Sequence, residues 1–206
     1  MKILLGILVI GLACSVRGDE PASPQTSGPT VETIVCIRHG EKPVGGLGQL
    51  NCRGLNRALA LPKVLLAKYG TPQFVFAPNP TQKVDGKNRG YYYYVRPLMT
   101  IEPTAIRCGL PVNTEFGFRQ IDGLEKELEK PEYQSATIFV AWEHGLLDEF
   151  VKKFLKAHGN PAHVPEWPGK DYDTIFLLKV THFGGSDTVS FTIDHEGLDN
   201  LSDDCP

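Results

Sequence analysis

The sequence predicts an α/β domain with a mostly parallel central sheet and helices on both faces. Short apolar runs rich in β-branched residues alternate along the chain with longer amphipathic stretches. This alternation is typical of parallel strands connected by helices. The 206 residues suffice for one domain with a buried core, which we expect over residues 33–206.

The expected elements follow one another from residue 33 onward, with strands where apolar runs are short and helices where apolar residues recur at helical spacing. Pro97 suits the first turn of a helix, whereas Pro103 is expected to kink that helix or to end its first part. The strands are expected at 33–37, 74–77, 136–142, 174–180 and 187–193, and the helices at 51–70, 96–110, 121–130 and 144–159.

The N-terminus has the features of an export signal. Lys2 precedes the apolar run of residues 3–13, which has signal-peptide length and is short for a membrane-spanning helix. Small residues precede Asp19, so we expect cleavage there and removal of residues 1–18.

Cys14 supports an alternative start of the mature chain, a lipid-modified cysteine anchored to a membrane. Gly11 stands where a lipoprotein signal usually has leucine. In both cases we expect an exported protein, secreted, periplasmic or in the cell envelope. Residues 19–32 are rich in Pro, Ser and Thr and are expected to be a flexible lead-in.

Four cysteines follow the expected signal. In an exported chain they can form disulfides, and four cysteines allow three pairings. None of them forms a CxxC pair, so no zinc site is expected. Cys36 lies in an expected strand, and a buried free thiol fits that position as well as a disulfide does. The pairing therefore stays open among Cys36, Cys52, Cys108 and Cys205.

The net charge of −3 and the absence of a run of basic residues exclude a general attraction to nucleic acid. Instead, single basic residues occur at strand ends. Arg38 and His39 follow the first expected strand, and His144 follows the third. Ligands of such sheets bind beyond the carboxyl ends of the strands. A histidine there can attack phosphorus through a neutral ring nitrogen, while guanidinium groups such as those of Arg38 and Arg96 bind phosphate.

These residues resemble the motifs of the histidine phosphatase superfamily, which has the phosphoglycerate mutase-like fold. RHG at 38–40 ends the first strand, an R-x-x-x-T helix starts at Arg96, and His144 with Gly145 ends a later strand. The resemblance extends from about residue 33 to residue 180. The family pattern R-A-x-Q-T-A-E-P-x-A…G-L-P-V is matched by Arg96, Thr100, Glu102, Pro103, Ala105 and residues 109–112.

The resemblance implies a phosphomonoester hydrolase that needs neither metal nor cofactor. His39 looks like the nucleophile that becomes phosphorylated, and Arg38, Arg96 and His144 look like the phosphate pocket. Two alternatives on the same fold are a mutase-type phosphotransferase and a non-catalytic module that binds a phosphorylated ligand. The sequence indicates no oligomeric state.

The proton donor to the leaving group is left open by the motifs. Relatives with His-Asp at the second site use that aspartate, whereas Gly145 follows His144 here. Glu143, Glu41 and Glu115 compete, and a useful acid must hold its proton near the working pH. We favour Glu143, whose alternative role is to orient a pocket group, and expect Glu41 beside the substrate.

Substrate specificity is expected in loops 44–50, 78–95 and 160–172. The tyrosines of residues 91–94 could form a wall over the substrate, although tyrosines near an arginine more often have a packing role. No basic run in these loops indicates a polyphosphorylated ligand.

Overall fold

The structure is a computed structural model that describes residues 28–87 and 89–206. The expected signal peptide, the cleavage site and Cys14 lie outside these residues. The first strand begins at Thr30, so the end of the expected lead-in belongs to the sheet. No helix in the described ranges is long and apolar enough to cross a membrane.

In the described residues, five strands form one sheet in the order β2-β5-β1-β6-β7. β1 and β2 pair with β5 in parallel, whereas β6 is antiparallel to β1 and β7 is antiparallel to β6. The α/β class is confirmed, and the sheet is mixed. The strands are β1 (Thr30–Arg38), β2 (Phe74–Phe76), β5 (Thr137–Trp142), β6 (Thr174–Phe183) and β7 (Ser186–His195).

The antiparallel pairing of β6 with β7 follows from the short connection between them. Gly184 and Gly185 form a two-residue loop, and both have positive φ, 61° and 79°. A loop in which both residues adopt positive φ matches the twist of a tight hairpin, which joins antiparallel neighbours. The sequence placed this strand pair correctly, and β6, which is antiparallel to both β1 and β7, makes the sheet mixed.

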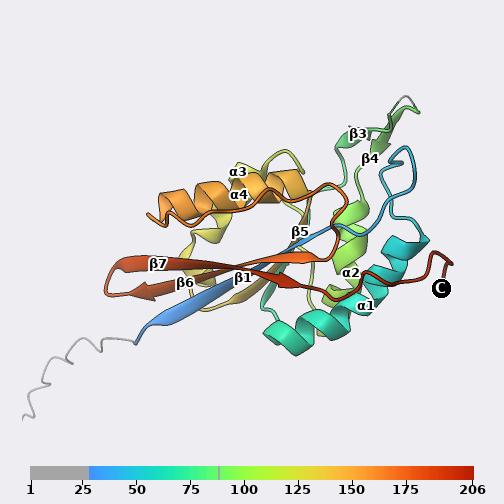
Figure 1. Cartoon of the computed structure of the whole chain (residues 1–206). Coiled ribbons are helices and arrows are strands. Elements are labelled where there is room, and N and C mark those ends of the chain that lie inside the picture. The colour runs from blue at the N-terminus through green and yellow to red at the C-terminus, as the bar shows by residue number, and fades with distance from the viewer. Residues whose placement is uncertain (1–27, 88) are drawn as a thin grey trace, which may run out of the picture.

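Helices cover both faces of the sheet, as predicted (Figure 1). α1 and α2 lie on one face and α3 and α4 on the other. α2 starts with Pro97 in its first turn and continues through Pro103, which therefore does not end it. The helices are α1 (Cys52–Tyr69), α2 (Arg96–Cys108), α3 (Ile121–Leu128) and α4 (His144–Ala157), with a short 3-10 turn at Pro131–Tyr133.

β1 is apolar without alternation because both of its faces are buried. Ile34 and Cys36 pack into the cluster on the α3 and α4 side, whereas Val35 and Ile37 pack into the cluster on the α1 and α2 side. A strand held from both sides fixes the position of the residue that follows it. That residue is His39.

Two further features border the carboxyl end of β1. A separate hairpin of β3 (Lys83–Asp85) and β4 (Tyr91–Tyr93) projects beside the start of α2 (Figure 1).

The structure decides the pairing of the cysteines that the sequence left open. Cys52 at the start of α1 forms a disulfide with Cys205. Cys36 is a buried free thiol and Cys108 is also free.

Candidate active site

The two predicted strand ends lie side by side. Arg38 of β1 is in register with Trp142 of β5, and the His39 N–H donates to the Trp142 carbonyl at 3.0 Å. Glu143 and His144 follow Trp142 directly, so both His-Gly segments lie at the same edge of the sheet.

His39 is buried and held in one tautomer. The residue is 1% exposed. Nδ1 lies 2.7 Å from the Gly40 carbonyl oxygen, so Nδ1–H donates and the lone pair is on Nε2. Burial, followed by the charge of Arg96, holds the pKa of His39 well below its usual range, against the raising effect of the Gly40 carbonyl. The ring is therefore neutral and nucleophilic at neutral pH.

The loop after His39 is tied to α2 and packed on α1. The Gly40 N–H donates to Thr100 Oγ1 at 2.9 Å, and that hydroxyl donates to the Arg96 carbonyl at 2.8 Å. A Cβ on Gly40 would lie 2.9 Å from the carbonyl oxygen of Gly54, so a side chain there would displace α1. The glycine of the RHG motif is thus required by close packing.

Arg38 points into the site from β1 and is nearly fully buried. Its Nη1 donates to the Asp171 carbonyl at 2.6 Å, and its guanidinium carbon lies 4.0 Å from the centre of the Tyr172 ring. Its Nε is buried and has no hydrogen-bond acceptor among the described residues. Part of this guanidinium is therefore available to a ligand.

Arg96 supplies a second guanidinium at the start of α2. Its guanidinium carbon lies 4.6 Å from the centre of the Tyr94 ring, and that ring meets His39 edge-on at 5.9 Å. Both Nε and Nη1 of Arg96 are buried and lack an acceptor in the described part of the chain. Buried N–H groups are rarely left unpaired, so the donors of Arg38 and Arg96 indicate an anion site beside His39.

His144 is held by its neighbour Glu143. Glu143 Oε1 lies 2.5 Å from His144 Nδ1, and Oε2 accepts the Leu146 N–H at 3.0 Å and so caps α4. The loop after α4 also approaches, because a Cβ on Gly169 would lie 3.8 Å from His144 Nε2. Pro168 in that loop accepts a long hydrogen bond from Arg38 (3.4 Å), which brings His144 and Arg38 to a common loop.

The protonation state of Glu143 disagrees with the role of proton donor. Burial raises its pKa, but the hydrogen bond and charge of His144 and the N–H groups of Leu146 and Gly145 outweigh burial and lower the pKa to about 2. A carboxyl group with this pKa is ionised near neutral pH. The geometry therefore favours the alternative role, a carboxylate that orients His144.

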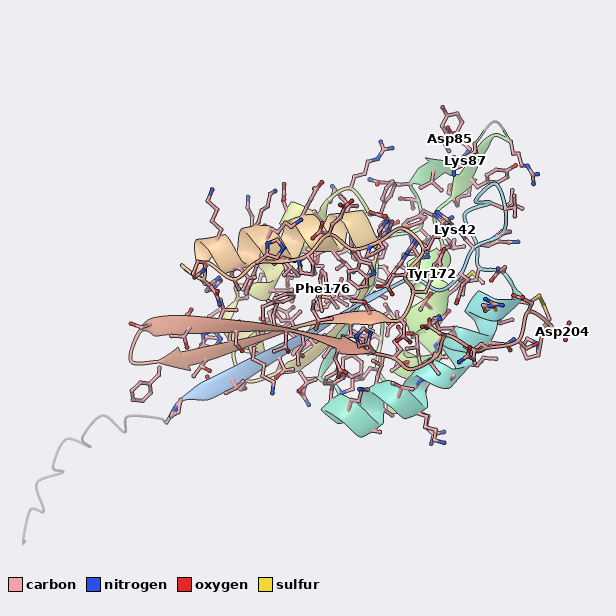
Figure 2. All side chains as sticks on the ribbon, in the orientation of Figure 1. Lys42, Asp85, Lys87, Tyr172, Phe176 and Asp204 are labelled. Atoms are coloured by element: carbon pink, nitrogen blue, oxygen red, sulfur yellow. A yellow bond between two sulfur atoms is a disulfide. The ribbon has the colours of Figure 1, made fainter. Side chains whose placement is uncertain are left out.

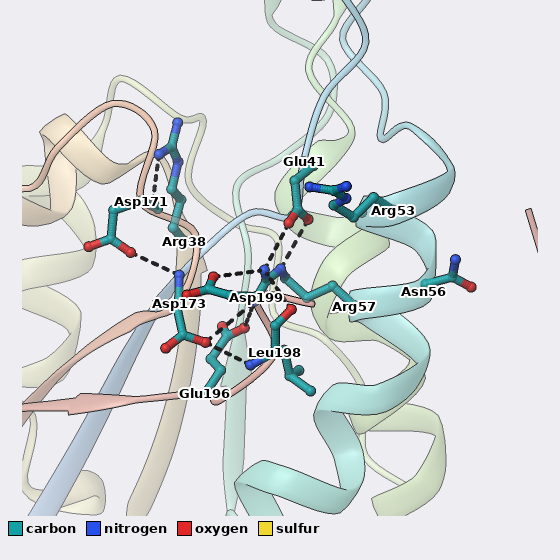
Figure 3. A network of polar contacts seen from close by, with 12 residues as sticks. Arg38, Glu41, Arg53, Asn56, Arg57, Asp171, Asp173, Glu196, Leu198 and Asp199 are labelled. Atoms are coloured by element: carbon teal, nitrogen blue, oxygen red, sulfur yellow. Dashed lines mark hydrogen bonds and ion pairs between the residues drawn. The ribbon is translucent and has the colours of Figure 1, made fainter. Parts of the chain in front are cut away.

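The other two candidates for the proton donor, Glu41 and Glu115, do not replace Glu143 in that role. Glu41 binds Arg57 through both oxygens, at 3.0 and 2.8 Å, so its carboxylate is engaged by α1 (Figure 3). Glu115 is exposed and follows the bridge between Phe76 and Asn113. In residues 28–87 and 89–206, no group of three or more His, Cys, Asp or Glu side chains is placed to hold a metal ion.

Sequence reasoning missed Tyr172 and Lys42, and it named Tyr94 only as part of the run of tyrosines at residues 91–94. Tyr172 stacks on Arg38, and Tyr94 packs against both Arg96 and His39. Their signals were weak, because Tyr94 is one of four consecutive tyrosines and Tyr172 is a single residue in a loop. Lys42, whose charge also acts on His39, lies two residues after the RHG motif and belongs to neither the RHG motif nor the R-x-x-x-T motif.

No protein-family model matches the sequence, and no curated protein matches it significantly. Solved structures do. A chain described as a candidate phosphohistidine phosphatase SixA from Nakamurella multipartitia superposes with a TM-score of 0.50 at 15% identity, covering 83% of this chain and 98% of that chain. A chain described as a candidate alpha-ribazole-5'-phosphate phosphatase from Escherichia coli superposes with a TM-score of 0.50 at 13% identity, covering 79% and 96%.

Both chains are members of the superfamily that the RHG motif resembles. At these identities the likeness concerns the arrangement of strands and helices. The α/β class and the resemblance stated from the sequence are thereby confirmed at the level of the fold. This chain has the phosphoglycerate mutase-like fold.

Proposed function

We propose that this chain is an exported phosphomonoester hydrolase that works through a phosphohistidine on His39 and requires no metal. One observation carries the proposal: a buried, neutral histidine lies beside two buried arginines, each of which has N–H groups without an acceptor among the described residues. The arginines supply the positive charge that stabilises a transferring phosphoryl group.

In the first step, the Nε2 lone pair of His39 attacks phosphorus, and the bond from phosphorus to the ester oxygen breaks. The leaving group departs with that electron pair and takes a proton from solvent. Arg38, Arg96 and His144 bind the phosphoryl oxygens, and Glu143 holds His144 in place. In the second step, water attacks phosphorus, the P–N bond breaks, and inorganic phosphate leaves as Nε2 recovers its lone pair.

Export is supported by two independent features. The apolar run at residues 3–13 predicts a signal peptide, and the Cys52–Cys205 disulfide is of a kind that persists in oxidising compartments. Export with a cleaved signal or a lipid anchor at Cys14 would both place the folded domain outside the cytoplasm.

The test compares the mature chain with its His39→Ala variant. Hydrolysis of 4-nitrophenyl phosphate is measured in EDTA, and acid-labile phosphate on the protein is sought after rapid quenching. We expect turnover by the natural chain and a loss of at least about a thousandfold in the variant, since the attacking atom is gone.

Activity that survives in His39→Ala would contradict the role of His39. If neither protein turns over but both bind phosphate, the chain is a binding module on this fold. Turnover and phosphate binding together separate an enzyme from a binding module, because a binding module needs only the cationic pocket.

A further inference from the structure

A further cation lies next to the phosphate pocket of Arg38, Arg96 and His144. Lys42 follows the RHG motif and is half-buried. Burial lowers the pKa of Lys42, and the positive charges of Arg96, Arg38 and Lys87 lower it further, against the opposite effect of Glu143. Lys42 is therefore a half-buried part of a positive cluster that extends beyond the two arginines.

Lys87 lies exposed in the turn that connects β3 to β4, and its positive charge acts on Lys42. Lys87 adopts a left-handed backbone conformation with φ of 49°, which non-glycine residues rarely adopt away from tight turns and functional sites. In Figure 2 the labelled side chain of Lys42 lies between Tyr172 and the hairpin that carries Lys87.

The hairpin is fixed to the loop that follows Lys42. The Gly48 carbonyl accepts the Arg96 N–H at 3.1 Å, and a Cβ on Gly48 would lie 2.2 Å from the Tyr93 carbonyl oxygen. Arg89 donates to the Val44 carbonyl at 3.3 Å. These contacts hold the two lysine-bearing segments against each other.

The positive charge of this lysine pair, Lys42 and Lys87, is not neutralised by the protein. In the described residues neither lysine has a carboxylate oxygen within 4.0 Å. Glu143, the carboxylate whose charge acts on Lys42, is already bound to His144 and to the Leu146 N–H. Like charges in proximity raise the free energy of the unliganded protein, and a bound anion relieves this repulsion.

We propose that Lys42 and Lys87 form a second anion subsite, so that the natural substrate is a phosphomonoester whose organic part carries another anionic group. This inference rests on the proposed phosphatase function. The scissile phosphate is bound by Arg38, Arg96 and His144, and the second anion, a carboxylate or another phosphate, binds the lysine pair. Lysine suits this role because its ammonium is a compact charge on a flexible stem and adapts to anions of different shape.

The test uses aryl phosphates that differ in one substituent. The values of kcat/KM are measured for 3-carboxyphenyl phosphate, for the bisphosphate of 1,3-dihydroxybenzene and for neutral 3-carbamoylphenyl phosphate. We expect the natural chain to prefer at least one anionic substrate by about tenfold, as for a partly desolvated ion pair. The preferred substrate distinguishes a carboxylate from a second phosphate.

Lys42→Met should abolish this preference, and Lys87→Gln should reduce it. The control is Lys83→Gln on the same hairpin, because Lys83 packs over the Tyr93 ring and should leave the preference unchanged. A preference that is absent in the natural chain, or that is unchanged in Lys42→Met, overturns the subsite.

A binding measurement separates this proposal from the proposed function. Calorimetry compares the affinity of the His39→Ala variant for the same three compounds, which that variant should not hydrolyse. Tighter binding of an anionic compound supports the subsite even if the natural chain hydrolyses none of them, and equal binding of all three overturns it. Failure of the natural chain to hydrolyse 4-nitrophenyl phosphate contradicts only the enzymatic proposal.

Discussion

At the scale of single residues, the site depends on which groups are charged. His39 is neutral because it is buried beside positive charge. Arg38 and Arg96, in the same place, have buried donors that find no acceptor in the part of the chain that the structure describes. Glu143 is ionised because two N–H groups and His144 bind it. Glu143 thus holds no proton for the leaving group near neutral pH, and substrates with acidic leaving groups should react fastest.

We expect Glu143→Gln to affect good and poor leaving groups equally. The change keeps an oxygen to cap α4 but removes the charge that holds His144. The kcat/KM values for 4-nitrophenyl phosphate and phenyl phosphate should therefore both fall about tenfold, as for loss of a positioning contact. The exposed Glu149→Gln on the same helix serves as the control.

A proton donor would behave differently. Its loss penalises the poor leaving group selectively, by about a hundredfold or more. A much larger loss with phenyl phosphate would restore Glu143 as the acid and contradict the orienting role.

At the scale of elements, the long strands β1, β6 and β7 bury a second polar group away from the site. Glu32 of β1 is 2% exposed, and its carboxylate lies 3.4 Å from His182 Nε2. His182 Nδ1 lies 2.8 Å from Asp187 at the start of β7. Burial, followed by the negative charge of Asp187, raises the pKa of Glu32 to about 8.

The raised pKa predicts that stability falls with increasing pH. Between about pH 4.5 and pH 8 the unfolded chain has lost the Glu32 proton while the folded chain retains it, so the unfolded state is favoured progressively. Glu32→Gln should remove this loss and raise the free energy of unfolding by about 2 kcal/mol at pH 9, with little effect at pH 4.

Urea unfolding of both proteins at pH 4, 6 and 9 measures this difference. The exposed Glu149→Gln should leave the pH dependence unchanged. A variant that is equally destabilised at all three values would show instead that the Glu32 carboxylate is a needed partner of His182.

At the scale of the whole molecule, the chain after β7 fastens the site loops to α1. Arg57 of α1 is fully buried, and it binds Glu41 after the RHG motif, Glu196 after β7, at 2.5 Å, and the Leu198 carbonyl (Figure 3). The Glu196 N–H donates at 2.7 Å to the carbonyl of Asp173, which directly follows Tyr172. This C-terminal strap, residues 196–205, thus connects both loops that border Arg38.

The disulfide closes the strap onto the start of α1. Cys205→Ser should lower the free energy of unfolding by about 2–4 kcal/mol, because the crosslink restricts the unfolded chain. Thermal unfolding with and without a reductant measures the effect, and Cys108→Ser, which removes a free thiol, is the matched control. If the melting temperature of the natural chain is the same with and without the reductant, the prediction is contradicted.

The sequence alone determined the order of the helices and of the strands in the main sheet, located the two His-Gly strand ends, and pointed to His39, Arg38, Arg96 and His144 as candidate site residues. These features follow from local patterns, because apolar periodicity and a short motif depend only on residues that are close in the sequence. The tertiary structure decided what depends on distant residues: the antiparallel edge, the Cys52–Cys205 pairing, the ionised state of Glu143, and the cluster of Lys42 with Lys87. Charge states and pairings depend on distances between side chains, and only the folded chain sets those distances.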